Sequence, residues 1–128
     1  MKRFATHFAL VVLVAVATVS CRTSPVFNVV NAPFTQPAPS LEEADAAIKR
    51  AGAALGWQSK TTEPGKILAT LPIRSHVAIV DVTFNQKEFS IMYRDSTNLK
   101  YDGTEIHSNY NGWIENLRNG IIAQSSLF

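Results

Sequence analysis

The sequence contains little cysteine, little excess charge and no long hydrophobic run. Its 128 residues include one cysteine, Cys21, which excludes an internal disulfide framework and a zinc site built from cysteines. A chain of this length has room for one ordinary domain, which excludes a multidomain enzyme. No glycine-rich phosphate loop is present and only 3 histidines occur. We therefore expect no cofactor and no metal site.

The N-terminal segment has the features of a secretory signal. Lys2 and Arg3 provide a positive start, and residues 8–19 form an apolar run in which only Thr18 is polar. As a helix this run would span about 18 Å, short of the roughly 30 Å hydrocarbon core of a bilayer. A permanent membrane span is therefore disfavoured, and we expect a signal peptide over residues 1–20.

The segment Thr18-Val19-Ser20-Cys21 resembles the lipobox of bacterial lipoproteins, with Thr18 where that family favours leucine. The resemblance implies that the signal is cut before Cys21, that the thiol is joined to diacylglycerol and that the new amino terminus is acylated. Several acyl chains anchor a protein stably. Arg22 follows instead of the aspartate that retains such lipoproteins in the inner membrane. The implied location is therefore the inner leaflet of the outer membrane, facing the periplasm.

The alternative is an ordinary secretory signal cut nearby. It would leave a free thiol on a soluble exported inhibitor or ligand-binding protein. An unpaired thiol is a liability in an oxidising compartment, which favours the lipid-modified form of Cys21.

Removal of the signal balances the charge of the chain. The 12 Lys and Arg residues fall to ten when Lys2 and Arg3 leave, and there are 10 Asp and Glu residues. The mature chain is formally neutral and has no basic footprint for nucleic acid. Membrane attachment would then depend on the lipid, and the expected partner is an envelope protein or peptidoglycan.

Residues 21–40 combine the expected lipidated cysteine with a proline-rich stretch, which predicts a semi-rigid tether. Several apolar side chains are unusual for a pure spacer. They leave open a docking segment that binds either the sheet edge of the domain itself or a partner; these residues are Val26, Phe27, Val29, Val30 and Phe34.

Residues 41–128 are predicted to form a single α+β domain. A capping box at Ser40 and Glu43 and an apolar stripe predict a helix over 41–55 that stops at Gly56. Alternation over 66–74 and 88–94, apolar residues on both faces of 76–84 and a short candidate over 57–61 predict three or four strands. Helical spacing returns over 109–119, with Gly120 as the stop. We expect a two-layer sandwich in which an antiparallel meander of three to four strands carries both helices on one face, in the order α-β-β-β-β-α.

Three stretches of this domain, residues 65–71, 93–101 and 106–114, resemble a family of small proteobacterial lipoproteins. The most specific part is Asp95-Ser96-Thr97-Asn98-Leu99-Lys100-Tyr101, followed by His107 to Trp113. That family has no assigned activity, so the resemblance supports the envelope location and implies no reaction.

Polar and aromatic residues gather between the last predicted strand and the second helix. Two interpretations stay open: the cluster stabilises the loop, or it forms a shallow binding surface for a peptide, glycan or protein. The residues are Asp95, Ser96, Asn98, Tyr101, His107, Tyr110, Asn111 and Trp113.

A catalytic interpretation of this cluster is weaker than either. Ser96, His107 and Asp81 or Asp95 supply the residue types of a hydrolytic triad. No Gly-x-Ser-x-Gly elbow presents the serine, so we do not expect an enzyme. Asp81 is the one charged residue within an apolar strand. We expect it to face the open side of the sheet beside Thr83 or to pair with Arg74 or Arg94, rather than to act as a base.

Overall fold

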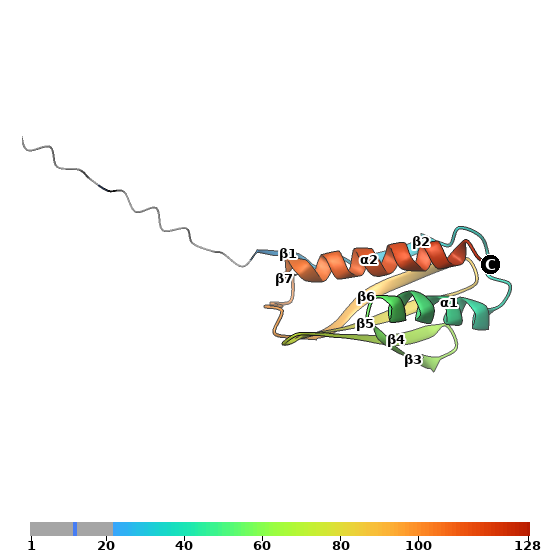
Figure 1. Ribbon diagram of the computed structural model, residues 1–128, viewed down its shortest axis with the longest axis horizontal. Helices are drawn as coiled ribbons and strands as arrows, with labels where there is room; N and C mark the ends of the chain where they lie inside the picture. Colours follow the sequence, from blue (N-terminus) through green and yellow to red (C-terminus); the bar gives the residue numbers. More distant parts are fainter. Residues whose placement is uncertain (1–11, 13–21) are drawn as a thin grey trace, which may run out of the picture.

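The computed structural model describes Val12 and residues 22–128 (Figure 1). Apart from Val12, the predicted signal peptide and Cys21 lie outside the described residues. The elements in chain order are β1 Thr23–Pro25, β2 Val29–Pro33, α1 Leu41–Ala54, β3 Gln58–Glu63, β4 Lys66–Ile73, β5 His76–Phe84, β6 Glu88–Thr97, β7 Glu105–His107 and α2 Ser108–Ser125.

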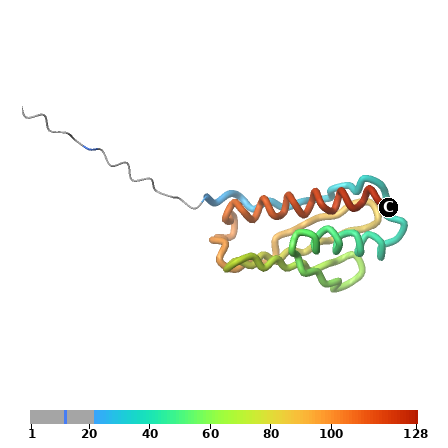
Figure 2. Tube along the Cα trace, viewed as in Figure 1, coloured from blue at the N-terminus to red at the C-terminus, as the bar shows by residue number. Residues whose placement is uncertain are grey.

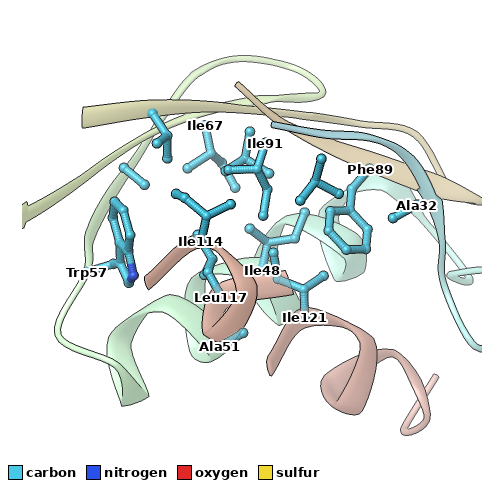
Figure 3. Close-up of a cluster of buried hydrophobic side chains, with 14 of the residues drawn as sticks. Ala32, Ile48, Ala51, Trp57, Ile67, Phe89, Ile91, Ile114, Leu117 and Ile121 are labelled. Carbon is cyan, nitrogen blue, oxygen red and sulfur yellow. The ribbon is translucent and has the colours of Figure 1, made fainter. Parts of the chain in front are cut away.

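These elements form an α+β domain around a five-stranded antiparallel sheet of order β2-β6-β5-β4-β3. Strands β3 to β6 make the predicted meander, because each lies beside the next. Both helices lie on one face of this sheet and pack against each other (Figures 1 and 3). The predicted fold class is therefore confirmed. The structure adds β1, β2 and β7 to the predicted order, and β1 pairs with β7 in a second, two-stranded sheet.

Helix α1 begins and ends at the predicted signals. The Ser40 hydroxyl accepts a hydrogen bond from the backbone N–H of Glu43 at 3.1 Å, which satisfies one free donor of the first turn. Beyond Leu55, Gly56 has a φ of 90°. Only glycine adopts this left-handed conformation without strain, so the chain leaves the helix there.

The core lies between the sheet and the helices (Figure 3). Alternate residues of the central strands point toward the helices, as period-two patterning predicts. The cross-strand pairs Ile67–Val82, Ala69–Val80 and Leu71–Ala78 join β4 to β5 on this face. The facing side chains of the helices, all buried, are Ile48, Ile114, Leu117 and Ile121.

Strand β4 lies between β5 and β3, and it accommodates Pro72 because β3 ends before it reaches this proline. Pro72 pairs with Val77 on β5, whereas the pairing of β3 with β4 reaches only as far as Gln58 opposite Thr70. No residue of β3 therefore pairs with Pro72. Past the end of β3, this side of β4 is a local sheet edge, where a residue without an N–H group is tolerated.

Helix α2 is longer than predicted, and the stop expected at Gly120 is wrong. The helix continues to Ser125, with Gly120 in its interior. A Cβ atom at Gly120 would lie 3.6 Å from Cβ of Ala51 on α1. The glycine thus sits where the two helices meet, and the burial of Ile121 beyond it offsets the cost of about 1 kcal/mol that glycine imposes on a helix.

The N-terminal segment is part of the domain rather than a free tether over residues 22–40. Strand β2 pairs with β6 at the edge of the large sheet, with Val29 opposite Ile91 and Ala32 opposite Phe89. Phe34 is only 6% exposed, and its ring stacks on Phe89 with centroids 5.4 Å apart. Of the two docking alternatives, the structure shows the one in which this segment binds the domain's own sheet edge. Figure 2 shows its path along the domain.

The first residues of this segment are held as firmly as β2. Thr23 pairs with His107, and the carbonyl of Arg22 accepts a hydrogen bond from the N–H of Ser108 at 3.0 Å. The Asn111 side chain clamps the same segment: its Nδ2 donates to the Pro25 carbonyl, and its Oδ1 accepts from the N–H of Phe27, both at 2.9 Å. These contacts join residues 22–27 to the start of α2.

The integration of this segment predicts a difference between two phenylalanines. Phe34→Ala should lower the free energy of unfolding by about 3 kcal/mol, because it empties a buried site. Phe27→Ala should cost about 1 kcal/mol or less, since Phe27 is 37% exposed. Urea unfolding of the chain from Arg22 onward measures both. Equal and negligible losses would show that the segment is a tether.

Candidate functional site

A polar hollow of about 510 Å³ lies where β6 ends and the chain turns toward β7. We call it the tyrosine pocket. Its lining residues are Tyr93, Arg94, Asp95, Ser96, Asn98, Leu99, Lys100 and Tyr101. The structure thus brings together Asp95, Ser96, Asn98 and Tyr101, half of the candidate surface predicted from the sequence.

A β-bulge and two unusual backbone conformations shape this pocket. Val80 pairs with Tyr93 but Ile79 pairs with Asp95, so Arg94 is the extra residue of the bulge. Further on, Asn98 and Lys100 have φ values of 57° and 54°. Asparagine tolerates this left-handed region, whereas lysine seldom adopts it. Such backbone strain is concentrated at functional sites.

Two tyrosines form the aromatic wall of the pocket. The rings of Tyr93 and Tyr101 lie with centroids 4.1 Å apart, and the Tyr93 hydroxyl shares a hydrogen bond of 2.7 Å with Oγ of Ser96. Burial raises the pKa of Tyr93, against the lowering effect of that hydrogen bond. Tyr101 is 41% exposed, so its ring is accessible to a ligand.

Several polar groups of the pocket have capacity left for a ligand. Asp95 Oδ1 accepts from the N–H of Ser96 at 2.8 Å, and Asn98 Nδ2 donates to Ser75 at 3.1 Å. Among the described residues, Asp95 Oδ2, Asn98 Oδ1 and the ammonium group of Lys100 make no hydrogen bond. The local bonds hold these side chains in place, and their remaining atoms stay available.

Tyr110 packs against this aromatic wall from the core. It is fully buried and meets Tyr93 edge to face, with centroids 5.7 Å apart. Its hydroxyl has no hydrogen-bond partner in the part of the chain that the structure describes. Burial raises the pKa of Tyr110 strongly, and the neighbouring Tyr93 and Tyr101 add to the rise. A buried hydroxyl without a partner lowers the stability of the fold.

The other three predicted candidates have structural roles. Nδ1 of His107 accepts a hydrogen bond from the N–H of Asn109 at 3.2 Å and so caps α2. Asn111 clamps the N-terminal segment through Pro25 and Phe27. Trp113 packs against the core, with its ring 6.3 Å from that of His76.

The three residues that could supply a hydrolytic triad through Asp81 bind other partners. Ser96 bonds Tyr93, His107 bonds Asn109, and Asp81 pairs with Arg94 at 3.0 Å. The last contact is one of the two pairings predicted for Asp81. Within residues 22–128 no group of three or more His, Cys, Asp or Glu side chains is placed to hold a metal ion.

A second hollow, of about 470 Å³, lies between α1 and the hairpin of β3 and β4. Leu41, Pro64 and Phe84 supply apolar lining, and Glu42, Asp45 and Glu63 supply carboxylates. No motif indicates it in the sequence, because its residues come from three separate stretches of the chain. Asp45 is already engaged, by Lys49 at 2.8 Å and by the Thr61 hydroxyl at 2.6 Å.

Comparison with models of known families, with curated proteins and with solved structures finds no match to this chain. No helix of the described residues has the length and apolar character needed to cross a membrane. The interpretation of the site therefore depends on its own geometry.

The unpaired hydroxyl of Tyr110 makes a stability prediction. Tyr110→Phe should raise the free energy of unfolding by about 1 kcal/mol, because it removes a buried group that lacks a partner. Tyr93→Phe is the matched control and should lower it by about 1 kcal/mol, since Ser96 loses its hydrogen bond. Equal losses in both variants would contradict the geometry described for Tyr110.

The same residue predicts a pH dependence. The pKa of Tyr110 is raised in the folded protein, above the ordinary value of about 10 for tyrosine. The unfolded chain therefore ionises first, and stability should fall as the pH rises above about 10. Tyr110→Phe should make that fall less steep in urea unfolding measured from pH 8 to 11.

Proposed function

We propose that this protein is a lipid-anchored lipoprotein of the bacterial cell envelope that acts as a binding or assembly accessory, with the tyrosine pocket as its binding site. The observation that carries the binding role is the union of an accessible Tyr101 ring with the free polar atoms of Asp95, Asn98 and Lys100 in one hollow. Its volume falls in the range of small-ligand sites.

The chemistry of the pocket suits a polar ligand with a flat apolar face. An aromatic ring packs on such a face, and a carboxylate, an amide oxygen and an ammonium group supply acceptors and a donor around it. Peptides and glycans both combine flat apolar faces with polar groups. Peptide segments occur in envelope proteins, and both occur in peptidoglycan. The balanced charge of the mature chain supports a role without nucleic acid, and the hydrogen bonds of Ser96 and His107 support a role without catalysis.

The anchor is tested by Cys21→Ser. If the lipoprotein proposal holds, this variant loses the acyl mass, is processed differently and moves from the membrane to the soluble fraction of cells. Intact-mass measurement and membrane fractionation check both points. Unchanged processing and fractionation would favour the alternative of a soluble exported ligand-binding protein.

The pocket is tested by crosslinking in intact cells. A photoreactive phenylalanine analogue at Tyr101 should capture a specific envelope component, whereas the same analogue at exposed Lys60, on β3, should not. Asp95→Asn keeps the contact of Oδ1 with Ser96 and removes the charge, so it should reduce capture at Tyr101 roughly tenfold. Capture that is the same at both positions, or insensitive to Asp95→Asn, would contradict the assignment of the pocket.

A further inference from the structure

The residue proposed to carry the lipid is one peptide bond away from the folded domain. Consecutive Cα atoms lie about 3.8 Å apart, so Cys21 is within that distance of Arg22. The Arg22 carbonyl bonds the N–H of Ser108, and Thr23 pairs with His107. Arg22 and Thr23 therefore have a fixed place at one end of the domain.

The residues that follow Thr23 are bound to the domain and cannot act as a flexible spacer. The N–H of Val26 donates to the Thr104 carbonyl at 3.1 Å, and Asn111 holds Pro25 and Phe27 from α2. Beyond them Val29 is buried in the core. To free a spacer, the chain would have to break all of these contacts.

We propose that the domain stands end-on against the membrane, with its near end in contact with the lipid headgroups. The near end comprises residues 22–25, 73–76 and 97–108, and the far end comprises residues 34–43, 62–66 and 84–88 (Figure 1). Helix α2 runs from one to the other, and its 18 residues span about 27 Å. This inference rests on the proposed lipid anchor at Cys21.

The distribution of charge fits this orientation. The near end carries three basic residues, Arg22, Arg74 and Lys100, against two acidic ones. The far end carries four acidic residues against two lysines: Glu42, Glu43, Glu63 and Glu88. An anionic bilayer surface attracts the first and repels the second. Tyr101 adds an exposed aromatic ring to the near end, and such rings favour the membrane interface.

The orientation determines where the binding site meets its ligand. The carbonyl of Leu99, in the lining of the tyrosine pocket, accepts from the N–H of His107 at 2.8 Å, and His107 pairs with Thr23. Two contacts, from Leu99 to His107 and from His107 to Thr23, therefore link the pocket to the residues that follow the proposed anchor. The pocket would take its ligand at the level of the headgroups, whereas the acidic far end would face the periplasm.

Energy transfer from two labelled positions tests the orientation. Thr104→Cys at the near end and Thr62→Cys at the far end are matched substitutions at exposed sites. The full lipidated protein, labelled on the new thiol, is placed in vesicles of phosphatidylethanolamine and phosphatidylglycerol that contain a fluorescent acceptor lipid. Transfer should be roughly twofold stronger from position 104, because the ends lie about 27 Å apart.

A flexible Gly/Ser insertion of about ten residues between Cys21 and Arg22 serves as the control. Its root-mean-square length of about 17 Å should abolish most of the difference. Equal transfer from the two positions without the insertion would overturn the end-on orientation.

Thiol labelling of the unsubstituted protein tests separately whether Cys21 carries the lipid. A lipidated Cys21 has no free thiol, so the unsubstituted protein should take up no label. Labelling of that protein would contradict the lipid anchor, whatever the orientation.

Discussion

The pairing of the N-terminal segment with β6 and β7 is the constraint on which the rest of the structure depends. Without it, β6 would be an open sheet edge, and open edges invite pairing with other chains. The segment covers that edge with β2, lays Phe34 over Phe89 and, through Asn111, links itself to the first turn of α2. One stretch of chain thus completes the sheet, the core and the attachment of the second helix.

The same pairing connects the proposed lipid anchor to the proposed binding site. Thr23 lies beside His107, and His107 bonds the Leu99 carbonyl in the wall of the tyrosine pocket. A chain tethered by a long spacer would leave the position of its binding site undetermined relative to the membrane. Because residue 21 directly precedes the folded residues, the proposed anchor would determine the position of the proposed binding site relative to the membrane. A neutral mature chain suits this arrangement, because the lipid, not charge, would supply the affinity for the bilayer.

Much of the fold could be predicted because its signals are local. The cap at Ser40, the left-handed Gly56 and the apolar patterns of β4 and β5 each act within a few residues. Strand β2 escaped prediction because Asn31, with a φ of 51°, and Pro33 interrupt its alternation, and its partner lies far along the chain. The predicted helix stop at Gly120 is wrong because contact with α1, which is not visible in the local sequence, determines the role of this glycine. In the site, Asp95 to Tyr101 are neighbours in sequence and are predicted together, whereas the role of Asn111 depends on a segment more than 80 residues away.

Amide hydrogen exchange over residues 22–38 of the mature protein tests the central claim most directly. The N–H groups of Val26, Phe34 and Ala38 bond carbonyls of Thr104, Lys87 and Gln86. They should therefore exchange as slowly as the amides of β6, in the same cooperative unit. Exchange at the rate of an unstructured chain, with β6 still protected, would show that the segment is a tether. The edge pairing and the end-on orientation would then both be wrong.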